Sequence, residues 1–443
     1  MGSMNLSKIK KAYFIGIKGA GMAALAQVLK GRGIEVLGSD THEKFFTDEV
    51  LKKLKIKVFE GFSFKNIPKD ADLIVASSAY DKTHLEIKYI LKKGWPIYSY
   101  SDILAHFFKE KYGFGVAGTH GKTTTTAMLG RVLEGLGLDP TVIVGGKVLE
   151  WGSNARVGRS KYFVAELDEY QEKFLKYRPK VLILTNIEYD HPDFFKSFKE
   201  YKNAFLKLVS RLPKDGLLVG CGEDKIIRET VKKAPCRTAL YYRKDLKKIR
   251  GFSLKIPGRH NQLNALAVLT LIKAWQDWGQ PPKNSGAAPK KILEEFQGTA
   301  RRFEIKGKLK NGVLLIDDYA HHPTEVRATL KAAKELYPKR RIWCVFHPHT
   351  FTRTKALLKD FARSFNSADK IIILDIYGSA REKKGSVHSR DLVRLVQSRQ
   401  SEVKYIPDIL KAADYLKKQM KPGDIIITMG AGDVWKLSAY LRG

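Results

Sequence analysis

The chain has 443 residues, with 80 lysines and arginines against 46 aspartates and glutamates, and a formal net charge of +34. This length exceeds one ordinary hydrophobic core, so two or three domains are expected. Because 44% of the residues are hydrophobic and no low-complexity tract occurs, a disordered chain is excluded. No apolar run approaches the roughly 20 residues of a membrane span and no signal-peptide pattern occurs. We therefore expect a cytoplasmic protein without membrane insertion.

Cysteines are few and far apart in this sequence. Cys221, Cys236 and Cys344 form no CxxC pair, so neither a disulfide framework nor a zinc site is expected. Thiols of this kind fit a reducing cytoplasm. Residues 1–3, which precede Met4, are expected to be a remnant of expression rather than part of the fold.

The excess of positive charge brings nucleic-acid or membrane-surface binding into consideration. The lysines are nevertheless scattered along the whole chain rather than gathered on one helix or in a tail. Examples are the lysine pairs at residues 52–53, 232–233, 247–248 and 383–384. A solvated basic surface is therefore the favoured interpretation, and no nucleic-acid partner is expected.

Three α/β segments follow one another along the chain, each with apolar strands alternating with helical patterns. This alternation predicts parallel, doubly wound sheets covered on both faces. We expect a Rossmann-like domain at residues 4–107, a central domain with a P-loop ATPase-type parallel sheet at 108–305, and a Rossmann-like C-terminal domain at 306–443. The expected strands are residues 13–17, 35–40, 73–76, 96–98, 112–117, 162–165, 181–184, 313–316, 342–346, 371–374 and 425–428.

The first glycine loop has the pattern Gly19-x-Gly21-x-x-Ala24 between a strand and a helix. Glycines there let the backbone approach a diphosphate, which the positive end of the helix attracts. Asp40, which closes the second strand, lies where a ribose-binding acid is expected. The pattern indicates a nucleotide diphosphate without separating NAD from a UDP-sugar. A helix packed closely on a strand, with no ligand, is the alternative.

The second glycine loop also lies between a strand and a helix, which is expected to begin near Thr124. Backbone N–H groups of such a loop surround phosphates, Lys122 bridges the β- and γ-phosphates, and the Thr123 hydroxyl holds Mg²⁺. The strict P-loop pattern is missed by one position, because Val116 stands where its first glycine should be. Strand, loop and helix together still predict ATP binding. The loop reads Gly118-Thr119-His120-Gly121-Lys122-Thr123-Thr124.

Polar residues follow two further strands, in residues 165–170 and 185–193. The carboxyl ends of strands are where α/β sheets bind ligands. Oxygen ligands with one imidazole suit Mg²⁺ or Mn²⁺ whose coordination phosphates complete. For His191, the alternative is a histidine that only caps a turn.

Downstream, several polar residues stand at candidate positions. Asn261 and Asn264 are three apart on one helical face and could pair with an adenine edge, although Asn261 could equally cap the helix. A guanidinium in the pair Arg301-Arg302 suits a γ-phosphate or an acyl phosphate. His321 and His322 do not indicate zinc, because no further Cys or His lies at ligand spacing.

These motifs together resemble the Mur ligases, the enzymes that assemble the peptide of bacterial cell walls. His120 in the variable position of the second loop is similar to the muramate branch of that family. The resemblance covers essentially the whole chain. It implies ATP-dependent ligation of L-alanine to UDP-N-acetylmuramate through an acyl phosphate, with Mg²⁺ (or Mn²⁺). We expect a monomer or homodimer, although the sequence does not decide between them.

The resemblance also implies roles for individual residues. The UDP-sugar would be bound by Gly19, Ala20, Gly21, Met22, Asp40, Ser77 and Ser78. ATP would be bound by residues 118–124 together with Asn261, Asn264, Arg302 and Asp318. The metal ligands would be Thr123, Glu166 and His191. Catalytic roles fall to Lys122, Arg302, Asp318 and His321, with the base for the amine sought near Asp318. The amino acid would be bound by His322, His349, Arg353 and Arg381.

Two departures from the family pattern matter. Phe205 stands where several Mur branches carry a carbamylated lysine that bridges the metals, which fits the alanine-adding branch and leaves the second ion's ligands open. Thr350 stands where some members carry arginine, so the group that binds the amino-acid carboxylate is less defined.

Three alternatives remain beside the alanine ligase. A ligase that recycles a murein tripeptide is less similar at residues 16–22 and 378–382. A nicotinamide-dependent dehydrogenase would use the first loop but leaves Lys122 and Thr123 unexplained. A basic, nucleic-acid-stimulated ATPase would explain the charge but not the polar segments at residues 190–193 and 318–323.

Overall fold

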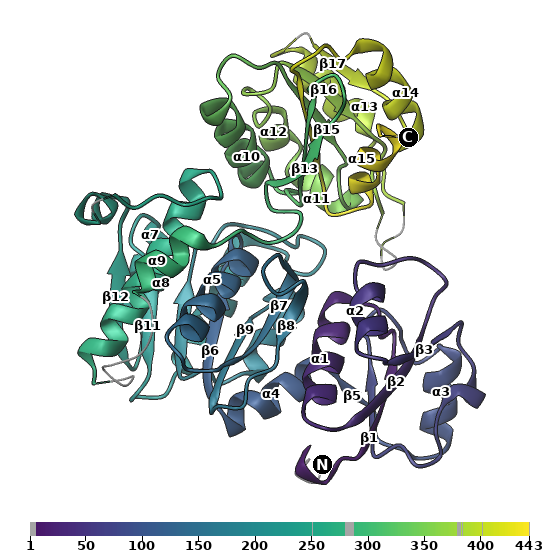
Figure 1. The fold of residues 1–443 in the computed structure, drawn as a ribbon, viewed down its shortest axis with the longest axis vertical. Helices are drawn as coiled ribbons and strands as arrows, with labels where there is room; N and C mark the ends of the chain where they lie inside the picture. The colour runs from purple at the N-terminus through teal and green to yellow at the C-terminus, as the bar shows by residue number, and fades with distance from the viewer. Residues whose placement is uncertain are drawn as a thin grey trace. The chain divides into compact units, whose positions relative to one another are not determined.

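The computed structural model describes residues 6–249, 251–279, 288–378, 382, 384–400 and 402–442. The strands form three separate sheets, with five, seven and six strands, in a mixed α/β fold (Figure 1). The predicted α/β class with three such sheets is confirmed. The chain forms two compact units: the first contains the first two sheets, and the second contains the third sheet with residues 189–201 and 253–263.

None of the described helices is both long and apolar enough to cross a membrane.

The first sheet has the strand order β3-β2-β1-β4-β5, and all of its pairs are parallel. The order reverses between β1 and β4, and ligands of open α/β sheets bind at the carboxyl ends of strands at such a point. The strands are β1 (Lys11–Ile15), β2 (Glu35–Asp40), β3 (Lys57–Glu60), β4 (Leu73–Ala76) and β5 (Tyr98–Ser99). The helices are η1 (Leu6–Lys8), α1 (Ala20–Gly31), α2 (Asp48–Lys53), η2 (Phe64–Asn66), α3 (Leu85–Lys92) and α4 (Tyr100–Glu110).

The second sheet has the order β12-β11-β10-β6-β9-β7-β8, and only the edge strand β8 is antiparallel to its neighbour. The carboxyl ends of β6, β9 and β10 therefore meet at one edge of the sheet. The strands are β6 (Tyr112–Ala117), β7 (Thr141–Val148), β8 (Ser153–Arg156), β9 (Tyr162–Glu166), β10 (Val181–Leu184), β11 (Leu217–Cys221) and β12 (Arg237–Tyr241). The helices are α5 (Lys122–Gly135), η3 (Tyr170–Lys176), α6 (Phe198–Ser210), α7 (Lys225–Val231), η4 (Arg243–Lys248), α8 (Arg259–Asp277) and α9 (Pro289–Glu295).

The third sheet has the order β13-β14-β18-β15-β16-β17, with β13 antiparallel to β14 and the other pairs parallel. It begins at Glu304, two residues before the expected domain boundary at 306. The strands are β13 (Glu304–Lys308), β14 (Leu314–Asp318), β15 (Ile342–Phe346), β16 (Lys370–Ile373), β17 (Val403–Tyr405) and β18 (Ile425–Met429). The helices are α10 (Pro323–Leu336), α11 (Phe351–Ala356), α12 (Leu358–Ala362), α13 (Ser389–Gln397), α14 (Ile409–Gln419), η5 (Val434–Lys436) and α15 (Leu437–Tyr440).

Alternate residues of the central strands of the third sheet enter two different hydrophobic cores. Cys344 and Phe346 in β15 belong to one core, and Trp343 and Val345 belong to the other. Successive side chains of a strand point to opposite faces, so both faces of this sheet are buried. This explains why its strands read as continuous apolar runs in the sequence.

Candidate active site

The first glycine loop leaves the end of β1 and lies against the segment that follows β4. Gly16 has a φ of +78°, and a Cβ there would lie 2.7 Å from the Tyr80 ring and 2.9 Å from Ser77 Cβ. Ser77 N donates to Ile15 O at 2.9 Å. Helix α1 then begins at Ala20. The two loops at the reversal of strand order are thus in contact, and Ser77 lies beside the predicted UDP-sugar loop.

The Asp40 carboxylate accepts hydrogen bonds from the backbone at the start of this loop. Its side chain is 4% exposed, and its two carboxylate oxygens accept hydrogen bonds from Lys18 N at 2.6 Å and Thr41 N at 2.7 Å. Burial raises the pKa of Asp40, although these hydrogen bonds oppose the shift. Ser78 accepts a hydrogen bond from Lys173 Nζ at 3.4 Å. Asp40 therefore shapes the loop, and its ribose contact stays a prediction.

The second glycine loop requires glycine at two positions. Gly118 has a φ of +135°, and a Cβ there would lie 2.1 Å from Thr185 Oγ1. Gly121 has a φ of +80°, and a Cβ there would lie 2.7 Å from Asn264 Oδ1. Asn264 of α8 is thereby placed directly against the predicted ATP loop. Helix α5 begins at Lys122, two residues earlier than expected.

Residues that follow β10 hold the loop in shape. The Asn186 side chain accepts from His120 N at 2.9 Å and donates to His120 O at 3.1 Å. The Thr119 hydroxyl donates to Glu188 O at 2.8 Å, and His120 Nε2 lies 2.9 Å from Glu188 Oε2. The sequence analysis missed Asn186 and Glu188 as supports of this loop. Their position directly after a strand expected in the same sheet was the available signal.

Lys122 is held inside the loop by a buried carboxylate. Its Nζ lies 2.8 Å from Glu169 Oε2 and also donates to Gly118 O at 2.6 Å and to Thr119 O at 3.2 Å. The Glu169 side chain is 1% exposed. Burial alone would lower the pKa of Lys122, but the charges of Glu169 and Asp168 outweigh burial and raise it. Glu169 is a second functional candidate that the sequence analysis missed.

Two of the predicted metal ligands lie in the first unit and offer oxygen atoms. Thr123 in the first turn of α5 is 8% exposed. Glu166 ends β9, and a Cβ at Gly145 would lie 2.2 Å from its Oε1, so the carboxylate lies directly over a residue without a side chain. A hydroxyl and a carboxylate beside a phosphate loop fit Mg²⁺. His191 lies in the second unit and has a positive φ of 55°.

The expected metal-bridging position is apolar in the structure. Phe205 is fully buried and packs edge-to-face on Phe174, with ring centroids 5.2 Å apart. A phenylalanine in such a place supplies no ligand atom, which agrees with the departure noted in the sequence.

In the second unit, Asp318 closes β14 and fixes the junction before β13. Its carboxylate accepts from Phe303 N at 2.8 Å and from Ala320 N at 2.7 Å. Burial raises the pKa of Asp318 to about 6, against the opposing charge of Arg302. The Arg302 guanidinium lies 5.0 Å from the centre of the Tyr319 ring and 3.8 Å from Glu325 Oε1. Arg302 and Asp318, both predicted to act on ATP, are therefore neighbours.

Arg353, predicted to bind the amino acid, is part of a buried ion pair. Its Nε lies 2.8 Å from Asp190 Oδ1, and the two side chains are 5% and 6% exposed. Its Nη1 lies 3.2 Å from His349 Nδ1, and the rings of His349 and His321 are 6.1 Å apart. Arg353, His349 and His321 are thus brought together, and their binding of the amino acid stays a prediction.

Two of these imidazoles are kept neutral by their surroundings. Burial lowers the pKa of His321 to about 4, with Glu325 opposing and Arg353 adding to the shift. Burial also lowers the pKa of His349 to about 3, helped by His321 and Arg353. At neutral pH both rings therefore carry a free electron pair on one nitrogen.

His322 and Asn261 have structural partners. His322 is 3% exposed and caps α10 by accepting from Thr324 N through Nδ1 at 3.3 Å. Asn261 is 3% exposed, and its Nδ2 donates to Pro257 O at 2.7 Å. The Asn261 bond ties α8 to the segment before it but satisfies no free N–H group of the helix, so it does not test the capping alternative. Asn264 lies at the loop. Arg381 lies outside the described residues.

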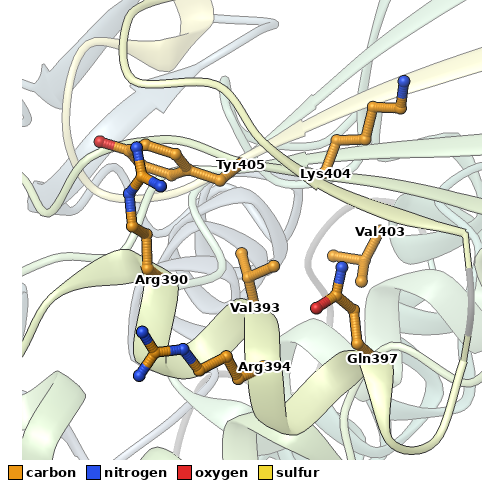
Figure 2. A pocket seen from close by; sticks show the side chains of 7 residues that line it. All are labelled: Arg390, Val393, Arg394, Gln397, Val403, Lys404 and Tyr405. Carbon is orange, nitrogen blue, oxygen red and sulfur yellow. The ribbon is translucent and has the colours of Figure 1, made fainter.

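A shallow groove of about 480 Å³ lies elsewhere in the second unit, between α13 and the edge strand β17 (Figure 2). Its lining includes no residue predicted for the site. The lining residues are Arg390, Val393, Arg394, Gln397, Val403, Lys404 and Tyr405.

Three domain families match consecutive parts of the chain. Residues 11–112 match the Mur ligase family, catalytic domain; residues 116–252 match the Mur ligase middle domain; and residues 301–432 match the Mur ligase, glutamate ligase domain. The matches cover both glycine loops and the segments that contain Arg302, Asp318 and Arg353.

Individual proteins are similar over almost the whole chain. A UDP-N-acetylmuramate–L-alanine ligase of Acetivibrio thermocellus is 41% identical, across 97% of this chain and 95% of that protein. The structure of a UDP-N-acetylmuramate–alanine ligase of Thermotoga maritima has a TM-score of 0.78 and 29% identity, covering 97% of this chain and 98% of that one. A murein peptide ligase of Psychrobacter arcticus shares the fold, with a TM-score of 0.70 and 22% identity over 98% of both chains. The chain belongs to the Mur ligase family.

Proposed function

We propose that this protein uses ATP to join L-alanine to the carboxylate of UDP-N-acetylmuramate, a step in peptidoglycan precursor synthesis. The 41% identity with an L-alanine ligase over 97% of the chain carries this proposal, because it spans every segment that holds a predicted site residue. Membership of the Mur ligase family leaves no support for a dehydrogenase or a nucleic-acid-stimulated ATPase.

Each of the three segments of the chain binds a different substrate. Residues 4–107 bind the UDP-sugar, through the loop at Gly19–Met22 with Asp40, Ser77 and Ser78. Residues 108–305 bind ATP, and residues 306–443 contribute the amino-acid site. The close approach of Gly16 to the Tyr80 ring supports UDP-sugar binding by residues 4–107. It brings together the loops after β1 and β4, where the strand order reverses and ligands of such sheets bind. The contact of Gly121 with Asn264 supports ATP binding by residues 108–305.

A carboxylate is a poor electrophile, because an oxide ion would have to leave. Transfer of the γ-phosphoryl group from ATP to a carboxylate oxygen gives an acyl phosphate and ADP. Lys122 and Arg302 stabilise the charge on the phosphoryl oxygens during transfer. The amine of alanine then attacks the acyl carbon, and phosphate leaves with the oxygen that it took from the carboxylate.

Mg²⁺ (or Mn²⁺) would be held by Thr123, Glu166 and His191, with phosphate oxygens completing its coordination. When bound, it neutralises charge on the phosphates of ATP. The ligands of a second ion are not defined by these residues, because Phe205 supplies none.

His321 is the group to which we assign the proton of the attacking amine. Its pKa of about 4 keeps the ring neutral at physiological pH, so one ring nitrogen can accept a proton, as a weak base. Its Nδ1 lies 2.9 Å from Tyr319 O, so the ring orientation is fixed when Nδ1 carries the proton and donates. Nε2 is then the basic nitrogen. His349 and Arg353 beside it would receive the amino acid.

The experiment that tests the proposal is phosphate release with ATP, Mg²⁺ and UDP-N-acetylmuramate. L-Alanine, L-serine, glycine and the murein tripeptide are added in separate reactions. Release that depends on alanine is the expected result, and release only with the tripeptide would assign the recycling reaction instead. No release with any of the four would overturn the ligase proposal.

Light scattering in the same buffer tests the expected monomer or homodimer.

A further inference from the structure

A buried network of side-chain amides connects helix α1 to the β7–β8 hairpin. Asn154 in β8 is 0% exposed, and Gln27 in α1 is 5% exposed. Gln27 Nε2 donates to Asn154 Oδ1 at 3.0 Å, and Asn154 Nδ2 donates to Ala20 O at 2.7 Å. The Ser153 hydroxyl donates to Gln27 Oε1. Both amides are therefore satisfied by specific partners away from water, so a shift of either element would leave buried polar groups unpaired.

The residue that accepts the hydrogen bond from Asn154 lies next to the predicted UDP-sugar loop. Ala20 is the first residue of α1 and directly follows Gly19 of the predicted UDP-sugar loop. The helix N-terminus that would attract the diphosphate is thus held by a strand of the sheet that carries the ATP loop.

The same hairpin also supports α5, the helix that begins at Lys122 of the ATP loop. A Cβ at Gly130 of α5 would lie 2.9 Å from both the Trp151 ring and Val142 Cγ1. Trp151 Nε1 donates to Glu134 of α5 at 3.0 Å. One hairpin therefore contacts both helices that start at the two phosphate loops, α1 and α5 (Figure 1).

We propose that Asn154 and Gln27 are positioning residues that set the spacing between the UDP-sugar loop and the ATP loop. This inference rests on the proposed ligase function. The carboxylate of a sugar held by the first loop must reach the γ-phosphate of an ATP held by the second. A misplacement of about 1 Å can lower such a rate about 100-fold. Directional hydrogen bonds between buried groups favour one spacing, because another spacing would leave polar groups unpaired.

Two near-isosteric variants and their combination test this role in the full-length protein. Asn154→Leu and Gln27→Met each leave a buried partner unpaired, and the double variant replaces both amides by apolar groups of similar size. We expect the double variant to be more stable to heat than Gln27→Met, because Asn154 Oδ1 is no longer left buried and unpaired. We expect it to stay about 10- to 100-fold slow in the first phosphoryl transfer.

The rate is measured in a single turnover without alanine, by trapping the acyl phosphate with hydroxylamine. Binding of ADP alone and of UDP-N-acetylmuramate alone is measured by calorimetry, and both affinities are expected to be retained. Tyr112→Phe is the matched control: it removes the hydrogen bond from Trp275 Nε1 to the Tyr112 hydroxyl in the same unit but leaves the hairpin and its amides intact, and its rate should equal that of the wild type.

A folded double variant that forms acyl phosphate at the wild-type rate would overturn the positioning role. So would a loss of rate that simply follows stability across the three variants and Tyr112→Phe. If the wild type itself forms no acyl phosphate, the proposed function fails and this inference fails with it. The wild-type reaction therefore separates the two outcomes.

Discussion

The Lys122 ammonium nitrogen lies 2.8 Å from the Glu169 carboxylate, in a pair that is almost completely shielded from water. The lysine also donates to two carbonyls of its own loop, Gly118 and Thr119. Without nucleotide, the lysine that would bridge the phosphates thus already has a countercharge. If Lys122 binds the phosphates as proposed, ATP would compete with this carboxylate for the same ammonium group.

Glu169→Gln should destabilise the nucleotide-free protein by about 3 kcal/mol, because it leaves a buried ammonium without its countercharge. The phosphates of ATP would replace that charge. The increase in melting temperature on adding ATP should therefore be larger for the variant than for the wild type. An equal or smaller increase in a folded variant would show that Glu169 does not compete with the nucleotide.

Gly118→Ala should abolish ATP binding. The added Cβ would lie 2.1 Å from Thr185 Oγ1, at a φ of +135° that disfavours any other residue, so the loop must move. Gly137→Ala is the matched control, because Gly137 also has a positive φ, of +74°, but nothing lies within 4 Å of its Cβ position. Calorimetry with ADP should show loss of binding for the first variant and normal binding for the second. Equal affinities would contradict the assignment of this loop.

Asp190→Ala should destabilise the second unit by about 3–5 kcal/mol, since it leaves the Arg353 guanidinium buried and unpaired. Arg353→Met in the same chain should recover part of that loss. A double-mutant cycle by hydrogen exchange in α10 would measure the coupling between the two side chains. Additive effects would mean that the pair contributes nothing specific.

Acid should weaken the second unit through His260. Burial lowers the pKa of this ring from its usual 6.5 to about 4, although Glu325 opposes the shift and Arg302 adds to it. Between these two values the unfolded chain binds more protons than the folded one. The contribution of the neutral His260 ring to the stability of the second unit is therefore complete above pH 6.5. It is lost as the pH falls towards about 4.

Hydrogen exchange in α10, corrected for intrinsic rates, would detect this effect. The opening free energy should fall by about 1–3 kcal/mol between pH 7 and pH 4.5 in the wild type. His260→Gln should show a smaller fall, because glutamine does not titrate. An identical fall in both proteins would assign the effect to other groups.

The sequence predicted the central strands well because they are buried on both faces. The ranges expected at 112–117, 181–184 and 342–346 coincide with β6, β10 and β15. Edge and hairpin strands escaped prediction, and so did the fully buried inner strand β11. Residues 304–308 of β13 and 153–156 of β8 are polar and only partly buried, so they lack the apolar run that identifies a parallel strand.

The same distinction holds at the site. Glycine loops are visible in sequence, because the geometry that they need is local. The partners of those loops are set by pairing between strands distant in the chain. In the sequence, Asn186, Glu169 and Asn154 are ordinary polar residues. Their contacts with the loops depend on the fold, in which β6 lies between β9 and β10 and β8 pairs with β7.

The most direct test of the account follows one oxygen atom. UDP-N-acetylmuramate labelled with ¹⁸O in its carboxylate is incubated with ATP, Mg²⁺ and L-alanine, and the phosphate and the amide product are analysed by mass spectrometry. The account predicts one ¹⁸O atom in each phosphate released and an equal amount of alanyl product, since the phosphate leaves with a carboxylate oxygen. Unlabelled phosphate, or phosphate without the alanyl product, would contradict it.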